Sequence, residues 1–291
     1  MELFAFLLAA LLSFVPPFVL PRGGKADGVT IPLDSARNDP NFKLPPVSEA
    51  RRPNSPLVVI DAGHGGRDPG AISPLGGQRE KYVTLALARA LRDGLIASGR
   101  VRVALTRNDD SFLELRDRYE IARRLKADLF ISIHADAAPN PDASGATIYT
   151  LSEVASDREA ALLAARENKV DIIGGVGPAA KDADVNRILI DLAQRESMSV
   201  SADFTRALYR EAAPFIPFRP VYHRFASFVV LKAPDVPSIL FEAGYITHPR
   251  DVAYIHSREG QRQIATGLRR AIEAHFARRM SDVRSARPGT S

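Results

Sequence analysis

From Leu57 onward the chain alternates short apolar runs with longer stretches in which apolar residues recur at helical spacing. Short continuous runs are typical of buried strands, and spacings of three and four residues are typical of amphipathic helices. The predicted strands are Leu57–Ile60, Val101–Leu105, Leu129–Ile133, Gly145–Leu151, Phe228–Leu231 and Ser238–Phe241. The predicted helices are Tyr82–Ala97, Leu113–Leu125, Ser156–Asn168, Val185–Leu208 and roughly Glu259–Arg279, with a glycine-rich break at Ile172–Pro178.

This alternation predicts an α/β fold, a single domain with a twisted, mostly parallel sheet flanked by helices on both faces. Ligand sites in such sheets lie beyond the carboxyl ends of the strands. His64, His134 and Glu242 each follow a predicted strand closely. We therefore expect all three side chains at one edge of the sheet.

The segments outside this alternation predict the domain organisation. Residues 1–21 are almost wholly apolar from Leu3 to Leu20, which indicates a secretory signal peptide or an uncleaved anchor held in the inner membrane by residues 3–20. Glu2 stands where such signals usually carry a basic residue, and a buried core helix is the alternative. Residues 22–55 are a proline-rich linker, 56–280 the folded domain and 281–291 a basic flexible tail.

Composition narrows the possible chemistry. The chain has no cysteine, so a metal ion must be held by histidine and carboxylate side chains. A cysteine-free exported protein fits a bacterial periplasm. The net charge of +5 is concentrated near the C-terminus, where a solvated helix end is the simplest reading. No basic and aromatic pattern typical of nucleic-acid binding is present, so we expect no nucleic-acid partner.

Two histidines and one glutamate have the placement of ligands in a catalytic zinc site with an open position. His64 lies between glycines that permit a sharp turn, His134 ends an apolar run, and Glu80 opens a predicted helix. Asp61, two residues before Gly63, is a candidate to accept a hydrogen bond from the His64 ring. Each residue alone has a structural alternative, such as a satisfied core histidine or an acid that favours a helix N-terminus.

The other histidines lack this placement. His256 and His275 fall in helical stretches, and His223 follows no predicted strand. His248 lies two residues beyond Ile246, near the expected site, and is the substitute ligand if one of the three candidates is wrong.

The motifs carry a resemblance to a known family. They are Asp61-Ala62-Gly63-His64-Gly65-Gly66, Asp68-Pro69-Gly70-Ala71, Glu80 with its helix, Leu105-Thr106-Arg107, Ala127 to Asp136, Gly145 to Tyr149 and Val230 to Glu242. In this order, from about Leu57 to about Phe276, they resemble the zinc-dependent N-acetylmuramoyl-L-alanine amidases of type 3. Departures from the family pattern are Tyr245 and His248, where Phe and Asn are usual, and Arg123-Arg124-Leu125-Lys126, where Ala-Asn usually precedes the third strand.

The resemblance implies a site and a reaction. His64, Glu80 and His134 would bind one Zn²⁺ per chain, and Glu242 would be the catalytic acid. Asp61, Arg107 and Asp136 would support these residues or contact substrate. The implied reaction is hydrolysis of the amide between N-acetylmuramic acid and L-alanine in peptidoglycan, in cell-wall turnover and daughter-cell separation.

A segment near Ser152–Ala183 resembles the insertion of the division-associated subgroup of Gram-negative bacteria. There a helix blocks the active site until an activator protein, here expected to carry a lysostaphin-like domain, displaces it. Glu153, Glu159 and Glu167 are equal candidates to reach the zinc. A surface helical excursion without a regulatory role is the alternative.

Two other functions remain open at this point. A zinc peptidase that cuts within the stem peptide would use the same metal chemistry and differ only in its substrate contacts. A non-catalytic wall-binding module would keep the fold but lose part of the site. The presence of His64, Glu80, His134 and Glu242 favours an enzyme.

Overall fold

The computed structural model describes residues 42–138, 140, 142–169 and 187–285. The chain divides into two units, Met1–Asp34 and Ser35–Ser291, and the first lies wholly outside the described residues. The expected signal segment 1–21 and the break at Ile172–Pro178 therefore lie outside them too. Among the helices that are described, none has the length and apolar character needed to cross a bilayer.

A six-stranded sheet forms the centre of the second unit, in the order β2-β1-β3-β6-β4-β5. Its strands are β1 (Leu57–Ala62), β2 (Arg102–Leu105), β3 (Leu129–His134), β4 (Ala146–Leu151), β5 (Phe218–Ala226) and β6 (Ser238–Glu242). Every neighbouring pair is parallel except β4 and β6, which are antiparallel. The predicted mostly parallel sheet is confirmed.

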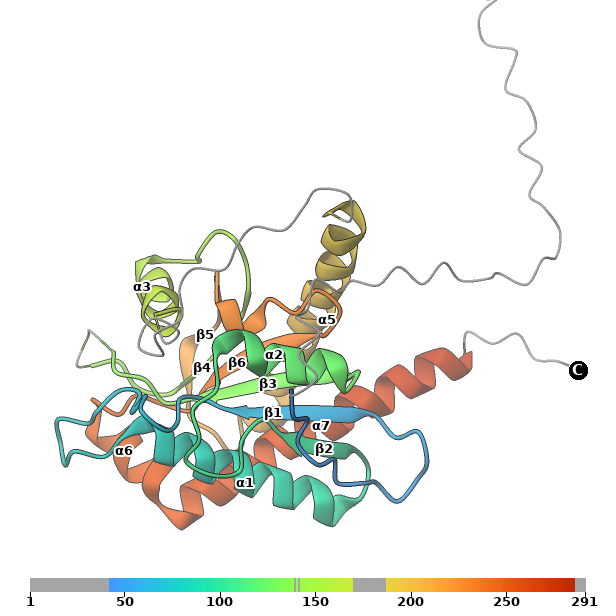
Figure 1. Cartoon of the computed structure of the whole chain (residues 1–291). Coiled ribbons are helices and arrows are strands. Elements are labelled where there is room, and N and C mark those ends of the chain that lie inside the picture. The colour runs from blue at the N-terminus through green and yellow to red at the C-terminus, as the bar shows by residue number, and fades with distance from the viewer. Residues whose placement is uncertain (1–41, 139, 141, 170–186, 286–291) are drawn as a thin grey trace, which may run out of the picture. The chain divides into compact units, whose positions relative to one another are not determined.

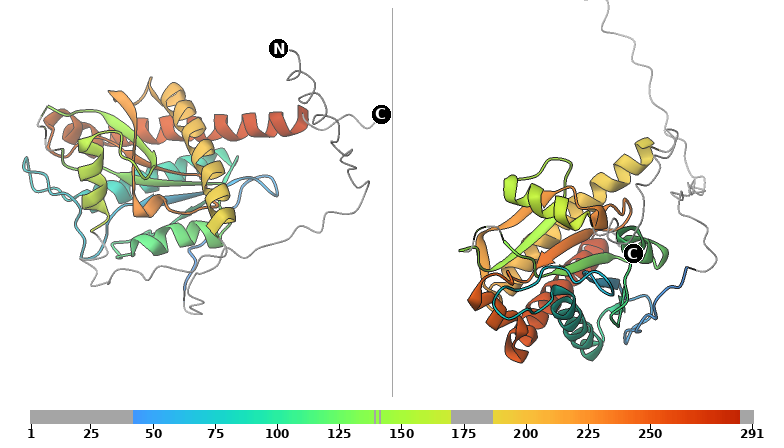
Figure 2. Two further views of the ribbon diagram at one scale, coloured as in Figure 1. Left: turned by 90° about the horizontal axis from the view of Figure 1, so that it is seen from above. Right: turned by 60° about the vertical axis from the view of Figure 1, so that its left-hand side comes forward.

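Helices cover both faces of this sheet, as predicted (Figure 1). They are α1 (Glu80–Ser98), α2 (Leu115–Arg124), α3 (Arg158–Glu167), α5 (Arg187–Ala212), the 3₁₀ turn η2 (Val229–Leu231), α6 (Pro249–His256) and α7 (Arg258–Ser285). In Figure 1, α1, α6 and α7 lie below the sheet, and α2 and α3 lie above it. The right-hand view of Figure 2 shows α3 and α7 on opposite sides.

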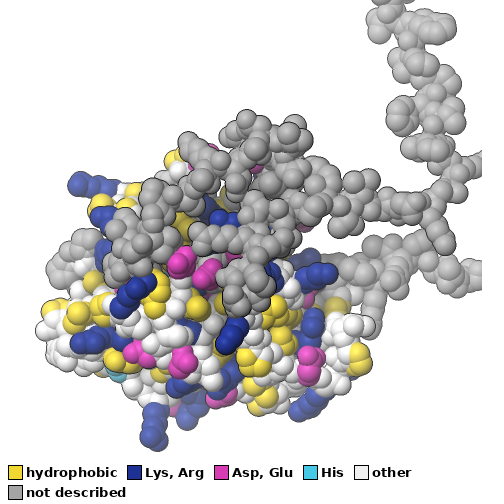
Figure 3. All heavy atoms as spheres, in the orientation of Figure 1, with side chains coloured by type: hydrophobic (Ala, Val, Ile, Leu, Met, Phe, Trp, Pro, Cys, Tyr) yellow, Lys and Arg dark blue, Asp and Glu magenta, His cyan; other side chains and the backbone are white. Residues whose placement is uncertain are grey.

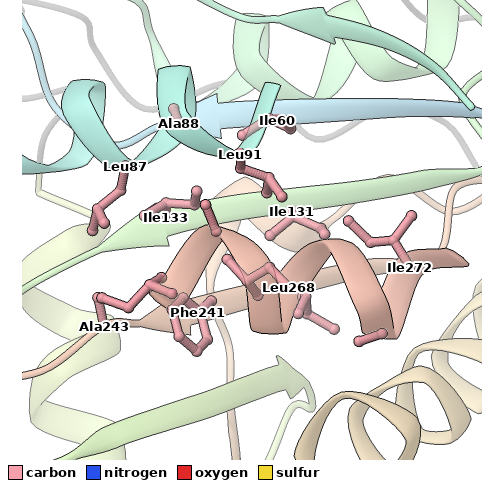
Figure 4. Packing of buried hydrophobic residues seen from close by; sticks show 14 of the residues in the cluster. Ile60, Leu87, Ala88, Leu91, Ile131, Ile133, Phe241, Ala243, Leu268 and Ile272 are labelled. Atoms are coloured by element: carbon pink, nitrogen blue, oxygen red, sulfur yellow. The ribbon is translucent and has the colours of Figure 1, made fainter. Parts of the chain in front are cut away.

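The core has two layers because strand side chains alternate between the two faces of the sheet. On one face, Ile60, Ile131 and Phe241 pack against Leu91 of α1 and Leu268 of α7 (Figure 4). On the other, the intervening strand residues pack against α2, η2 and α3. The strands are thus apolar on both faces, which is why each reads as a continuous run in the sequence.

Some predicted elements differ from the structure. The apolar run Phe228–Leu231 forms η2 and not a strand, because a run this short does not distinguish the two by periodicity. Strand β5 was not predicted, since Pro220 and exposed residues obscure its alternation. It lies at the edge of the sheet, where proline is tolerated. Helix α6 was also missed, and α7 continues to Ser285, past the predicted end.

The later part of the predicted linker over 22–55 packs on the folded domain. The backbone of Ser48 exchanges two hydrogen bonds with Val103 of β2, at 2.8 and 3.1 Å. Phe42 and Val47 lie against the second core layer. Figure 3 shows Lys and Arg side chains spread over the visible face of the molecule, with Asp and Glu side chains among them.

Candidate active site

Three neighbouring parallel strands carry the central side chains. His64 follows β1 by two residues, His134 ends β3, and Glu242 ends β6. β3 pairs with both other strands, and His134 lies in register with Glu242. The expectation that these residues meet at one edge of the sheet is confirmed.

Glycines allow the loop after β1 to bring His64 close to His134. His64 itself has a left-handed backbone, with φ of 61°. A Cβ atom at Gly63 would lie 2.6 Å from atoms of the His134 ring, and one at Gly70 would lie 2.7 Å from both Glu80 and His64. Larger residues would therefore separate the groups that the loop brings together.

Glu80 is fully buried at the first residue of α1 and is held by two backbone amides. The N–H groups of Ala71 and Ala135 donate to its two carboxylate oxygens, at 2.9 and 2.8 Å. The same oxygens lie 3.1 Å from His64 Nε2 and 3.2 Å from His134 Nδ1. Its buried carboxylate is thus fixed between the two imidazole rings.

Glu167, the last residue of α3, reaches the same two rings from the other side. Its Oε2 lies 3.6 Å from His64 Nε2 and 3.3 Å from His134 Nδ1, and the residue is 3 % exposed. The structure thus distinguishes Glu167 from the other two glutamates that the sequence made equal candidates for reaching the metal. Glu153 is exposed, and Glu159 pairs with Arg219 and Arg224.

The donor set is suited to a metal ion. His64, His134 and Glu167 each offer one ligand atom, and these atoms lie within 4.8 Å of one another. His64 Nε2 and Glu167 Oε2 are buried without a hydrogen-bond partner among the described residues. Ligand distances of about 2.0–2.2 Å in tetrahedral zinc sites put neighbouring ligand atoms roughly 3.3 Å apart. The separations of 3.1–3.6 Å found here match that spacing.

The charges of the cluster are mutually dependent. Burial alone would lower the pKa of His64, but the carboxylates of Glu80 and then Glu167 raise it well above its usual range. Burial would raise the pKa of Glu80, but His64 and then His134 hold it well below its usual range. The imidazoles and the carboxylates therefore stabilise each other's charged forms.

Glu242 is fully buried next to this cluster, with its two oxygens in different environments. The backbone N–H of Asp136 donates to Oε2 at 3.0 Å. Oε1 has no hydrogen-bond partner within the described part of the chain. Burial raises the pKa of Glu242 well above its usual range, and the carboxylates of Asp136 and Glu80 raise it further. A carboxyl group with a raised pKa is suited to proton transfer.

Asp136 connects the strand end to α3. Arg166, the residue before Glu167, donates from Nη1 to both carboxylate oxygens of Asp136, at 2.6 and 2.8 Å, and to the carbonyl of Ala137 at 2.9 Å. Burial and then the charges of Glu80 and Glu167 raise the pKa of Asp136 to about 7. Arg166 and Glu167 together fix the end of α3 on the site.

Asp61 has a different role from the one predicted. It accepts from Ser132, Thr106 and Arg118 at 2.6–2.9 Å, whereas His64 Nδ1 lies 2.7 Å from Asp68. The prediction for Asp61 is therefore wrong in this structure. Asp61 belongs to a strand and points into the layer that holds Arg118, but the left-handed turn at His64 returns the chain so that Asp68 meets the ring.

Two buried arginines hold the loop that carries His64. Arg107 donates to the carbonyls of Ala62 and Gly63, at 2.9 and 2.8 Å. Arg118 donates to the carbonyls of Ala62 and His64, at 2.8 and 2.9 Å. Burial and the charge of Arg118 lower the pKa of Arg107 to about 10. Arg107 thus supports the loop, and Arg118 is a second support that the sequence analysis missed.

Replacing Arg118 with methionine is expected to lower the free energy of unfolding by about 3–5 kcal/mol, because it leaves the buried Asp61 carboxylate without its charged partner. Urea unfolding followed by circular dichroism measures this. Arg206→Met is the control, since Arg206 pairs with Asp203 on the surface and its loss should cost under about 1 kcal/mol. Equal effects of the two substitutions would refute the supporting role of Arg118.

The remaining candidates lie outside the cluster. His248 precedes α6 with its Nδ1 3.9 Å from Asp251, so the substitute ligand is not needed. His223 contacts Thr150, His256 contacts the carbonyl of Val252, and His275 packs against Phe204. Asp68 and Arg166 were missed as site residues. Asp68 follows His64 by four residues within a motif already singled out, and this could have indicated the contact.

The fold and the site together define a class of protein. It is an α/β protein with a buried cluster of two histidines and two glutamates, able to hold a metal ion, at the carboxyl edge of the sheet. Residues 58–274 match the family described as N-acetylmuramoyl-L-alanine amidase, type 3. The chain belongs to this family.

Individual relatives agree with that assignment. N-acetylmuramoyl-L-alanine amidase AmiA of Escherichia coli K12 is 38% identical over 221 residues, 76% of each chain. AmiC of Neisseria meningitidis serogroup B is 36% identical over 240 residues, which are 81% of this chain and 57% of AmiC. Among solved structures, the amidase AmiC2 of Nostoc punctiforme is 31% identical, with a TM-score of 0.54 over 76% of this chain and 97% of AmiC2.

Proposed function

We propose that this protein hydrolyses the amide between the lactyl group of N-acetylmuramic acid and L-alanine of the peptidoglycan stem peptide, with one zinc ion per chain. The observation that carries this proposal is the buried cluster of His64, Glu80 and His134 beside Glu242, in a chain of the amidase family.

We assign His64, Glu80 and His134 as the zinc ligands. The backbone amides that hold Glu80 and the Asp68 carboxylate beside His64 Nδ1 orient two of these ligands in advance. Zinc held there supplies a Lewis acid that polarises the amide carbonyl and acidifies water.

Glu242 is the proton carrier of the reaction. The N–H of Asp136 fixes Oε2, which leaves Oε1 to accept the proton of the attacking water. The amine of L-alanine must be protonated as it leaves, and the same carboxyl group returns the proton to it. The burial of Glu242 excludes solvent that would compete for this proton.

Glu167 keeps this site closed. Its carboxylate lies against both histidines where substrate would have to approach, and Arg166 holds the end of α3 on Asp136. We infer that α3 is an autoinhibitory helix and that an activator protein with a lysostaphin-like domain displaces it. This would place the protein in the division-associated subgroup.

The cellular setting follows from the sequence. The apolar segment Leu3–Leu20 supports export to a periplasm, either after cleavage or with residues 3–20 as an inner-membrane anchor. The absence of cysteine is compatible with that compartment. We propose roles in cell-wall turnover and daughter-cell separation.

Digestion of purified sacculi distinguishes this function from the alternatives. The amidase releases stem peptides that begin with L-alanine, which mass spectrometry identifies. New ends only inside the stem peptide would identify a zinc peptidase. Binding to sacculi without any new ends, in a protein that retains zinc and has Glu167 replaced by alanine, would identify a wall-binding module.

Metal removal is expected to abolish sacculus hydrolysis and zinc to restore it, with one zinc atom per chain by elemental analysis. A His134→Ala variant should bind zinc less than about a tenth as tightly as the parent protein, since it loses one metal ligand. His256→Ala is the control, because the His256 ring contacts the carbonyl of Val252 among the described residues and is not part of the cluster. Full activity in the metal-free protein would contradict the zinc proposal.

A further inference from the structure

Two arginines of the sheet contact α3. Arg219 and Arg224 both belong to β5, and their side chains are only 14 % and 10 % exposed. Arg219 Nη1 donates to the hydroxyl of Tyr245 at 2.7 Å. Arg224 lies beside Tyr149, its register partner on β4. Neither arginine was needed to explain the amide hydrolysis.

Unpartnered polar atoms occur on the strands next to β5 in the sheet, β4 and then β6. Within the described residues, ten buried side-chain atoms have no hydrogen-bond partner. Three of them belong to the neighbouring strands β4 and β6: Thr147 Oγ1, Tyr149 Oη and Glu242 Oε1. Buried polar atoms are almost always hydrogen-bonded, so a group of exceptions beside a reactive carboxylate indicates a place that receives a ligand.

A single glutamate of α3 pairs with both arginines. Glu159 Oε1 lies 2.5 Å from Arg219 Nη1, and Oε2 lies 2.9 Å from Arg224 Nη1. Burial would raise the pKa of Glu159, but hydrogen bonds from the two arginines lower it. Asp157 is farther away, with Oδ2 3.5 Å from Arg224 Nε. When α3 leaves, the arginines lose this partner.

The spacing along α3 matches that of two groups in an acidic peptide substrate. Glu159 and Glu167 are eight residues apart on α3, or roughly 12 Å along the axis. One contacts the arginines while the other contacts the metal-binding histidines. An extended peptide covers about 12 Å in three to four residues. A scissile amide at the histidines would therefore put the third or fourth stem-peptide residue near the arginines.

We propose that Arg219 and Arg224 form a carboxylate-binding subsite for the stem peptide, and that Glu159 occupies it as a substrate mimic in the closed protein. This rests on the proposed amidase function. The lactyl carboxyl is consumed in the scissile amide, so the carboxylate must come from the peptide side. Guanidinium groups suit this task because they bind a carboxylate with two directed hydrogen bonds.

The test uses the full chain with Glu159→Ala and Glu167→Ala, so that neither acid competes with substrate. The substrates are N-acetylmuramoyl tetrapeptides with free carboxylates at the third and fourth residues, or with one of the two amidated. We expect amidation of the recognised carboxylate to raise KM about tenfold or more with little change in kcat, and the affected substrate identifies the source of the carboxylate.

Adding Arg219→Met and Arg224→Met should abolish this discrimination, and Arg219→Lys, which keeps the charge, should retain part of it. Arg206→Met, a surface control, should leave the discrimination unchanged. Equal KM values for all three substrates in the Glu159→Ala, Glu167→Ala protein, in which both arginines are intact, would overturn the subsite. Discrimination that survives both methionine substitutions would overturn it as well. Failure to cleave any substrate with zinc present would instead refute the amidase function.

Discussion

Replacing Glu242 with glutamine is expected to reduce kcat for sacculus hydrolysis by about 10²–10⁴-fold while zinc stays bound. The amide preserves the shape of the side chain and can still accept from the N–H of Asp136, but it cannot take a proton from water. Because Glu242 is fully buried, no solvent group replaces it. Release of stem peptides from dyed sacculi gives the rate, and elemental analysis gives the zinc content.

Glu153→Gln is the matched control, because Glu153 is an exposed glutamate. It should retain the parent rate. Loss of zinc together with activity in Glu242→Gln would make Glu242 a ligand and not a proton carrier. Substantial turnover in that variant would remove it from the mechanism.

Replacing Glu167 with alanine in the full chain is expected to raise basal hydrolysis about 10–100-fold. This range corresponds to a loss of about 1.4–2.8 kcal/mol in the interaction that holds α3 on the site. The substitution removes the carboxylate that lies against His64 and His134 but leaves Arg166 on Asp136. The initial rate on sacculi, without any activator, measures the effect.

Glu153→Ala is the control for this prediction, since it removes a carboxylate from the same segment without touching the site. Its basal rate should equal that of the parent. Unchanged or lower activity in a folded Glu167→Ala protein with normal zinc content would show that α3 does not block the site.

The convergence of His64, His134 and Glu242 was predictable because each follows an apolar run that is typical of a buried strand. Parallel strands then put their carboxyl ends on the same edge. Edge strand β5, with Pro220 and exposed residues, gave no comparable pattern. The arginine pair that it carries was therefore invisible to sequence reasoning.

The choice among the glutamates of α3 was partly within reach. Glu159, Leu163 and Glu167 recur every four residues, so they share the helix face that Leu163 buries. This spacing favours Glu159 and Glu167 over Glu153, which precedes the helix. Deciding that Glu167 meets the histidines and Glu159 the arginines requires the packing of α3 on the sheet, which local sequence does not encode.

Glu167 belongs to the same polypeptide as the histidines that it contacts. The proposed inhibition should therefore not depend on the protein concentration. Residues 152–157 join β4 to α3, so a short linker connects the helix that carries Glu167 to the sheet. A short tether gives an effective concentration in the millimolar range, on the order of 10³ times that of a micromolar protein. Under the proposed autoinhibition, dilution would therefore not release α3, and each molecule would be closed whatever its abundance.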